Sequence, residues 1–316
     1  MLYRFARALV AASVVGLPVT VLSQQPVFRG SGEAVRVFVT ATDHDGRLVT
    51  TLTREDFEVR DNGTPQPLTI FDNSPQPIRL IVLLDVSGSM AGNLPLLRAA
   101  AAQLVPRLDP LDKARVGSFG REVTISPVFT RDAGELERAL PEGIEPDAPT
   151  PLWRAVDEGL KAFDSDDPAR RVILVLSDGK DSGPISFRQR WVSPVEIIDR
   201  AREADVMIYG VGMRSRPLEP RMPGIGTAGL MAALTADLPD PGLARVAEES
   251  GGGYTEIRAG QDLGAAFSAV VEELHSQYLL GFAPPKRDGK VHKVEVRIAR
   301  KGVKPRARKS YTAPSS

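Results

Sequence analysis

The 316-residue sequence contains no cysteine and only three histidines. The absence of cysteine excludes disulfide bonds, thiolate metal sites, iron–sulfur clusters and cysteine nucleophiles. Three histidines leave little room for a histidine-rich metal centre, and we expect His44, His275 and His292 to lie at the surface or to support neighbouring groups. The 40 basic and 40 acidic residues balance, so the basic excess typical of a nucleic-acid-binding protein is also missing. Any chemistry must therefore come from carboxylates, hydroxyls and the backbone.

The sequence begins with the pattern of a targeting segment. Arg4 and Arg7 precede an apolar run over residues 8–22, which is short for a membrane-spanning helix. We predict a signal peptide at residues 1–23, with an uncleaved membrane anchor as the alternative. Cleavage would remove two basic residues and no acidic ones, which leaves a net charge of −2. No later stretch is long enough to span a bilayer, so the sequence predicts an exported protein of the periplasm, cell envelope or medium.

Residues 24–77 have the character of β-strands. Residues 35–40 alternate apolar and polar side chains, and residues 56–60 form a second short run of this kind. Asn62-Gly63 after that run is a strong hairpin signal, and residues 65–71 supply the next strand. We therefore predict a small antiparallel sheet over residues 34–77.

The pattern changes from residue 78 to residue 276. Residues 80–84 and 172–176 are continuous apolar runs, typical of strands buried on both faces of a parallel sheet. Helical spacings of apolar residues alternate with such strands, and Ser193, Pro194 and Glu196 mark one helix start. This alternation predicts an α/β domain with a doubly wound, mostly parallel sheet. Residues 214–240 interrupt it and are interpreted as an inserted surface loop, with a short helix at residues 230–234.

Residues 277–316 return to β character. Two strands are expected at residues 277–282 and 292–298, and the basic stretch over residues 300–309 is interpreted as a solvated strand end. Strands at both ends of the chain share the antiparallel pattern. We therefore predict that residues 24–77 and 277–316 pair into one small β-sandwich, with the α/β domain inserted between its halves.

A motif of alternating oxygen donors follows the first buried strand. Asp85, Ser87 and Ser89 supply a carboxylate and two hydroxyls on a loop that contains Gly88. Asp178 follows another buried strand, and Thr150 precedes a predicted helix. Ligands bind outside the carboxyl ends of strands in such sheets, and hard oxygen donors suit Mg²⁺, with Mn²⁺ and Ca²⁺ as alternatives.

With these segments in place, the sequence resembles the von Willebrand factor type A (VWA) domain family over about residues 78–276. The metal-ion-dependent adhesion site (MIDAS) of that family has the pattern Asp-x-Ser-x-Ser with a distant Thr and a distant Asp. The matching residues are Asp85, Ser87, Ser89, Thr150 and Asp178. The resemblance implies that the serines and the threonine coordinate the ion, that the aspartates do so directly or through water, and that an Asp or Glu of a protein partner completes the octahedron. Thr150 follows Ala148-Pro149, where the family usually has glycines.

The flanking segments resemble the exported bacterial "VWFA-related" proteins. Residues 56–66 and 278–284, together with the late strand at 293–297, carry this similarity. The resemblance implies an exported, non-enzymatic protein that binds another protein through the metal. The alternatives are a metal-assisted hydrolase or enzyme subunit, and a scaffold whose site is degenerate. The sequence carries no signal for an oligomeric state.

Four further residues are expected at the rim of the metal site. They are Gly88, Met90, Trp153 and Asp181. Ser87 is not expected to be a hydrolytic nucleophile, because the loop lacks Gly-x-Ser-x-Gly and no histidine is placed to act as its base.

Overall fold

The computed structural model describes residues 34–90, 93–144, 146–164, 166–178, 180–183, 190–214, 240–258 and 262–315. From Glu33 onward the chain forms one compact unit. The predicted signal peptide at 1–23 lies outside the described residues, and so does almost all of the insertion predicted at 214–240, with its short helix at 230–234. In the described ranges, no helix combines the length and the apolar character needed to cross a membrane.

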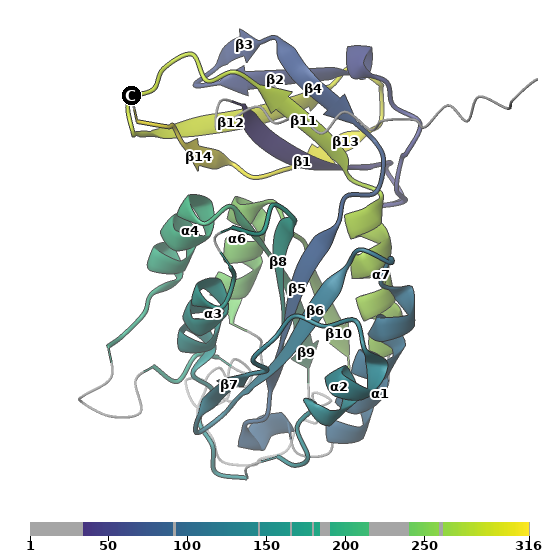
Figure 1. Ribbon diagram of the computed structural model, residues 1–316, viewed down its shortest axis with the longest axis vertical. Helices are drawn as coiled ribbons and strands as arrows, with labels where there is room; N and C mark the ends of the chain where they lie inside the picture. The colour runs from purple at the N-terminus through teal and green to yellow at the C-terminus, as the bar shows by residue number, and fades with distance from the viewer. Residues whose placement is uncertain are drawn as a thin grey trace, which may run out of the picture. The chain divides into compact units, whose positions relative to one another are not determined.

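Six strands of the described chain form a central sheet in the order β10-β9-β8-β5-β6-β7 (Figure 1). The first five run parallel, and β7 pairs antiparallel with β6 at one edge. The strands are β5 (Ile78–Asp85), β6 (Lys113–Phe119), β7 (Val123–Ile125), β8 (Arg170–Ser177), β9 (Val206–Arg214) and β10 (Tyr254–Arg258). The prediction of a doubly wound, mostly parallel sheet is confirmed.

Helices cover both faces of this sheet (Figure 1). One face carries α1 (Leu94–Leu104), α2 (Ala133–Arg138) and α7 (Leu263–His275), and the other carries α3 (Leu152–Lys161), α4 (Pro194–Glu203) and α6 (Pro241–Ser250). Short 3-10 turns lie at Arg54–Asp56, Gly88–Met90 and Val105–Arg107. The predicted start of α4 is confirmed, because Ser193 accepts a hydrogen bond from the Glu196 backbone and Glu196 closes the capping box.

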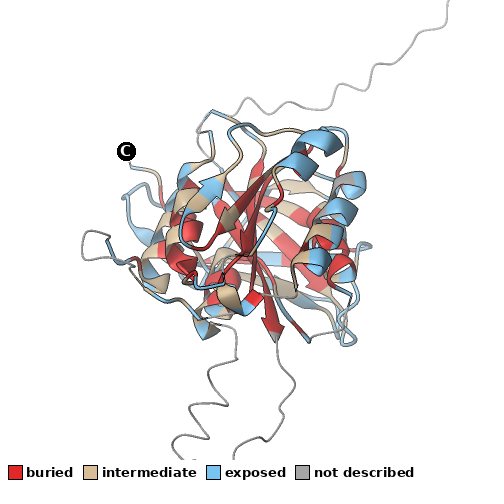
Figure 2. Ribbon diagram, turned by 90° about the horizontal axis from the view of Figure 1, so that it is seen from below, coloured by how far each residue is buried: buried red, intermediate tan, exposed pale blue. Residues whose placement is uncertain are grey.

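The apolar run of β5 is continuous because both of its faces are buried. Leu80, Val82 and Leu84 belong to the apolar core on the face of α1 and α7, whereas Ile81 and Leu83 belong to the core on the face of α3 and α6. Figure 2 shows the buried residues gathered on the central strands and the exposed ones on the outer surfaces of the helices. The apolar run of residues 80–84 ends at Asp85, which is the last residue of β5.

The two ends of the chain form a β-sandwich, as predicted. One described sheet has the order β13-β1-β11-β4 and the other has the order β14-β12-β2-β3. The strands are β1 (Val35–Thr42), β2 (Phe57–Asp61), β3 (Thr64–Gln66), β4 (Leu68–Asp72), β11 (Tyr278–Phe282), β12 (Val291–Ile298), β13 (Lys304–Arg306) and β14 (Ser310–Thr312). Each sheet therefore combines strands from before and after the α/β domain.

The prediction that residues 34–77 form one sheet was wrong. Strands β1 and β4 flank β11 in one sheet, whereas β2 and β3 belong to the other. An alternating strand has the same pattern whether its partner is its neighbour in sequence or a strand more than 200 residues away. Only the β2–β3 hairpin is local, and its turn residues Asn62 and Gly63 both have positive φ, at 47° and 83°, as a type I′ turn requires.

Of the two roles expected for the histidines, His292 has the second: it lies inside this sandwich, not at its surface, and supports neighbouring groups. Its Nδ1 is 2.9 Å from Oδ1 of Asp61, and the Tyr311 hydroxyl donates to Oδ2 of the same carboxylate, also at 2.9 Å. The side chains of Asp61 and His292 are both buried. The hydrogen bond to Asp61 raises the pKa of His292, with a smaller contribution from Asp288.

This raised pKa predicts a pH-dependent stability. Because the folded-state pKa lies above the unfolded value of about 6.5, protonated His292 stabilises the fold fully below that pH, and its contribution is lost as the pH rises through the folded-state pKa. Urea unfolding between pH 5.5 and 9 should therefore show a stability loss that is smaller in His292→Gln. The exposed His44 gives the control, since His44→Gln should follow the wild type. Identical pH profiles for wild type and His292→Gln would contradict the prediction.

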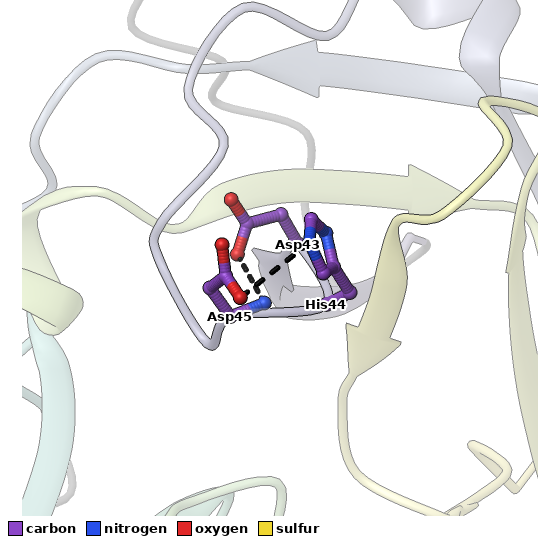
Figure 3. Close-up of side chains that lie close together, drawn as sticks. All are labelled: Asp43, His44 and Asp45. Carbon is purple, nitrogen blue, oxygen red and sulfur yellow. Dashed lines mark hydrogen bonds and ion pairs between the residues drawn. The ribbon is translucent and has the colours of Figure 1, made fainter.

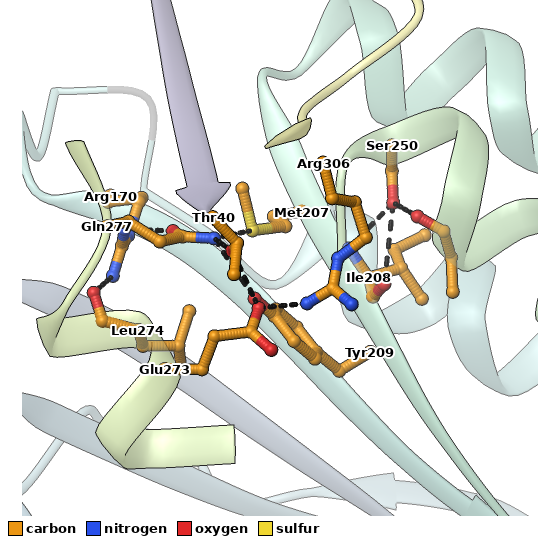
Figure 4. A network of polar contacts seen from close by, with 11 residues as sticks. Thr40, Arg170, Met207, Ile208, Tyr209, Ser250, Glu273, Leu274, Gln277 and Arg306 are labelled. Atoms are coloured by element: carbon orange, nitrogen blue, oxygen red, sulfur yellow. Dashed lines mark hydrogen bonds and ion pairs between the residues drawn. The ribbon is translucent and has the colours of Figure 1, made fainter. Parts of the chain in front are cut away.

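A buried polar network joins the sandwich to the α/β domain (Figure 4). Oε1 of Glu273, on α7, accepts hydrogen bonds from the hydroxyls of Thr40 and Tyr209 and from the guanidinium of Arg306. Gln277 donates to the Thr40 hydroxyl at 2.7 Å. The network therefore fixes the last helix of the α/β domain against β1 and β13.

The basic stretch at residues 300–309 is not simply a solvated strand end. Arg306 pairs with Glu273, Arg308 with Asp205 at 2.6 Å, and Lys309 with Glu248 at 3.3 Å. All three acidic partners belong to the α/β domain. The prediction was wrong here because ion pairs between distant segments leave no local pattern in a sequence.

Candidate metal centre

The predicted site residues gather at the carboxyl edge of the central sheet, where β5 and β8 end. These strands pair in parallel with Leu84 opposite Leu176, so Asp85 and Ser177 come next to each other. The strand order reverses at β5, since the chain continues to β6 on one side and later to β8 on the other. Such a reversal is where doubly wound proteins bind ligands.

Asp85 is held in a fixed orientation below the loop. Its Oδ1 accepts from the Ser87 backbone at 2.9 Å, and its Oδ2 accepts from the Ser177 hydroxyl at 2.6 Å. The side chain is fully buried. Burial raises the pKa of the Asp85 carboxyl to about 6; hydrogen bonds from Ser177 and Ser87 oppose this shift, and the nearby Asp178 carboxylate adds to it. A cation would relieve the cost of these two buried carboxylates.

The remaining oxygens form a chain of short contacts. The Ser87 and Ser89 hydroxyl oxygens are 3.1 Å apart, and the Ser89 hydroxyl donates to Oδ1 of Asp178 at 2.6 Å. Neighbouring ligands of an octahedral Mg²⁺ with bonds of 2.0–2.1 Å are about 2.9 Å apart, whereas the longer bonds of Ca²⁺ require roughly 3.3–3.7 Å. The two measured separations are also ordinary hydrogen-bond distances between oxygens. The set of carboxylate and hydroxyl oxygens suits a hard divalent cation.

Thr150 lies in a loop that is tied to both other loops of the site. The Gly88 backbone donates to the carbonyl of Ala148 at 3.4 Å, and the Ser182 backbone donates to the carbonyl of Thr150 at 2.9 Å. Thr150 is itself buried. The Thr150 loop therefore lies between the Asp85 loop and the Asp178 loop, although Ala148-Pro149 stand where the family usually has glycines.

Gly88 is a packing residue of this site. A Cβ atom at this position would lie 1.9 Å from the carbonyl oxygen of Pro146, in the Thr150 loop. Only glycine lets the two loops approach so closely.

Two of the four residues predicted at the rim are buried in the structure. Met90 is fully buried under α1 and α7, and Trp153 is buried between α3, α4 and α6, so neither side chain can contact a partner. Asp181 is partly buried and accepts hydrogen bonds from the backbones of Trp153 and Gly183. Burial, with the nearby Asp240 carboxylate, raises the pKa of Asp181. It therefore holds the start of α3 and remains partly exposed.

Sequence reasoning missed Ser177. Its hydroxyl orients the Asp85 carboxylate. Its position one residue before Asp178, at the end of a buried strand, is the sequence feature that could have identified it. The exposed Trp191, 60% accessible, is close to the same loop, with its ring 4.0 Å from the position of a Cβ on Gly183.

Two other groups of carboxylates and histidine lie away from this edge. Asp43, His44 and Asp45 are side by side in an exposed turn (Figure 3), where Asp43 accepts from the backbones of Asp45 and Arg47. In the second group, His275 contacts Asp112 at 2.8 Å and Asp109 at 3.6 Å. The Asp112 carboxylate also accepts from the Ile78 and Asp109 backbones, so it fixes the chain before β5 and β6.

Comparisons with known proteins were made with a family model, with the curated proteins and with solved structures. The model of the von Willebrand factor type A domain family matches residues 80–236. A search of the curated proteins gave no match. One similar solved structure is an aerotolerance-related membrane protein from Bacteroides fragilis, with 17% identity and a TM-score of 0.45. Another is BatB from Bacteroides thetaiotaomicron, with 20% identity and a TM-score of 0.43. Each match covers 62% of this chain and 98% of the other chain. A third is a von Willebrand factor type A protein from Catenulispora acidiphila, with 11% identity and a TM-score of 0.48, and the match covers 90% of this chain and 75% of that chain.

A doubly wound sheet with an Asp-x-Ser-x-Ser loop at its carboxyl edge defines a class of protein-interaction modules. Residues 80–236 match the von Willebrand factor type A domain family, so the chain contains a VWA domain, which is inserted in a β-sandwich.

Proposed function

We propose that this protein is an exported, non-enzymatic binding module that holds Mg²⁺ and uses it to bind an acidic side chain of a protein partner. The residues that would hold the ion are Asp85, Ser87, Ser89, Thr150 and Asp178. The observation that carries the proposal is the clustering of the hydroxyl and carboxylate oxygens at the carboxyl edge of the sheet.

The charges of the donor set suit this role. Two carboxylates balance the two charges of the ion, and the hydroxyls add none, so the ion stays attractive to one more anionic oxygen. Ser89 is exposed whereas Asp85 and Ser87 are buried, so the donor set opens to solvent on the Ser89 side. An Asp or Glu of a partner is a suitable ligand for that side.

The positions of the histidines favour binding over hydrolysis. His44 and His292 belong to the sandwich, and His275 ends α7 beside Asp112. In the described residues, none of the three lies at the carboxyl edge, where a general base for a metal-assisted hydrolase would be needed. This supports a non-enzymatic role.

The exported location is supported by the sequence pattern at the N-terminus. Arg4 and Arg7 before the apolar run of residues 8–22 indicate a signal peptide. The partner is then a protein of the periplasm, the cell envelope or the medium.

Isothermal titration calorimetry with Mg²⁺ tests the metal. We expect saturable heat with the wild type, and an affinity lower by at least about tenfold in Asp85→Ala, because a buried ligand group is removed. Asp147→Ala is the matched control, since Asp147 is an exposed aspartate of the neighbouring loop and its loss should leave the affinity unchanged.

Two outcomes would contradict the proposal. A wild type without Mg²⁺ heat would indicate a scaffold with a degenerate site, and an Asp85→Ala variant that binds as tightly as Asp147→Ala would place the metal elsewhere. For the partner, a pull-down from envelope extract should recover a protein with Mg²⁺ and lose it with EDTA.

A further inference from the structure

A small cavity lies at the junction of the sandwich and the VWA domain, at the amino edge of the central sheet. It offers about 30 Å³ to the centres of water-sized molecules, which exceeds the space that one water needs. Its walls come from the starts of β8 and β9, the ends of α4 and α6, and strands β1 and β14. It is therefore at the opposite edge of the sheet from the metal centre.

Five arginines line this cavity. They are Arg36, Arg170, Arg171, Arg202 and Arg308. The acidic side chains in the lining are Asp205 and Glu249, so the described lining has a formal charge of +3. Asp205 already pairs with Arg308. Such an excess of positive charge in a confined space favours an anion.

Several guanidinium N–H groups in this wall lack an acceptor. The Nε atoms of Arg170, Arg202 and Arg308 are buried and form no hydrogen bond in the described part of the chain. Arg36 is exposed, and its side chain forms no hydrogen bond or ion pair with described residues. A buried N–H donor without an acceptor lowers the stability of the fold. A bound molecule that supplies acceptors would remove this cost.

Arg170 is the most buried of the arginines without a described acceptor for Nε. It is 7% exposed, and its guanidinium carbon lies 4.6 Å from the centre of the Phe38 ring. Its terminal nitrogens donate to the side chain of Gln277 and to the carbonyl of Leu274, as Figure 4 shows. These contacts fix the plane of the guanidinium and leave its Nε directed to no protein acceptor.

We propose that this cavity binds a compact inorganic oxyanion of the phosphate or sulfate class. The planar N–H donors of arginine match the oxygens of such an ion, and the charge of the ion offsets the excess in the lining. A water molecule could accept the hydrogen bonds but would leave the charge unbalanced. The small volume excludes a nucleotide or a peptide. Because the lining includes β1 and β14 as well as β8 and α4, the bound ion braces the sandwich against the VWA domain.

Calorimetry with sodium phosphate at constant ionic strength tests this site in the full-length protein. We expect saturable binding to the wild type and at least tenfold weaker binding to Arg36→Gln and to Arg202→Lys. Arg36→Gln removes a side chain that has no partner among the described residues, so the fold should persist, and Arg202→Lys keeps the charge but loses the Nε donor. Arg98→Gln is the control, because Arg98 is on α1 and donates to the Pro141 carbonyl away from the cavity.

The readouts separate this site from the metal centre and from larger ligands. Both cavity variants should keep the Mg²⁺ affinity of the wild type. Glycerol 2-phosphate, which carries a bulky substituent, should bind at least tenfold more weakly than phosphate. Absence of saturable phosphate binding, or equal affinities in Arg36→Gln, Arg202→Lys and Arg98→Gln, would overturn the proposal. Equal binding of both phosphates would overturn the assignment to a free ion.

Discussion

Replacing Gly88 by alanine is expected to weaken Mg²⁺ binding about 100-fold, although all five proposed ligands remain. The new methyl group would lie 1.9 Å from the Pro146 carbonyl oxygen, and real Cβ atoms essentially never approach another heavy atom closer than 3.0 Å. The Thr150 loop must therefore move by about 1 Å or more relative to Ser87 and Ser89. Metal sites tolerate ligand displacements of only about 0.2 Å.

Calorimetry of Gly88→Ala with Mg²⁺ measures this effect. Gly143→Ala is the matched control, because Gly143 precedes the same loop and a Cβ there meets no atom within 4 Å. Circular dichroism should show that both variants stay folded. Wild-type Mg²⁺ affinity in Gly88→Ala would mean that the close approach of the two loops does not position the ligands.

The largest loss of stability is expected for Glu273→Ala. One oxygen of Glu273 accepts from Thr40, Tyr209 and Arg306, and both hydroxyls belong to side chains that are almost fully buried. Burial and the Glu273 carboxylate raise the pKa of Tyr209, so its hydroxyl remains a donor that needs an acceptor. Removing one partner of such a buried network costs about 3–5 kcal/mol.

Urea unfolding of Glu273→Ala measures this cost. Glu272→Ala is the control, because Glu272 is the exposed neighbour on the same helix and should change the unfolding free energy by less than about 0.5 kcal/mol. Glu273→Gln keeps an acceptor oxygen and should fall between the two. Equal stability of Glu273→Ala and Glu272→Ala would show that the network does not hold the domains together.

The architecture of the VWA domain could be predicted because its determinants are local. The apolar run of β5 ends at Asp85, and that of β8 ends at Ser177, one residue before Asp178, so parallel strands bring the two carboxylates to one edge. The sandwich could be predicted only in outline. Which sheet receives β1 and which receives β2 depends on pairing with β11 and β12, and alternation alone contains no information about that choice.

The site shows the same division between local and long-range information. The ligand set follows from the motif, but the burial of Met90 and Trp153 depends on helices that approach from other parts of the chain. The long-range partners of Arg306, Arg308 and His292 also could not be predicted, because each is more than 30 residues away in sequence. The sequence around a charged residue or a histidine does not show whether its side chain is exposed to solvent or forms an ion pair with a distant residue.

The interrupted sandwich also imposes an order of events during synthesis. Among the described strands, β1 pairs only with β11 and β13. Val37, for example, can pair only after Leu280 has been synthesised. At roughly 5–20 residues per second, the ribosome needs about 12–50 s to pass from the end of β1 to the start of β11. The VWA domain can form within that interval, since its strands are consecutive. Val35, Val37 and Val39 must remain unpaired until it is complete, so the newly made N-terminal strand is the segment most in need of a chaperone.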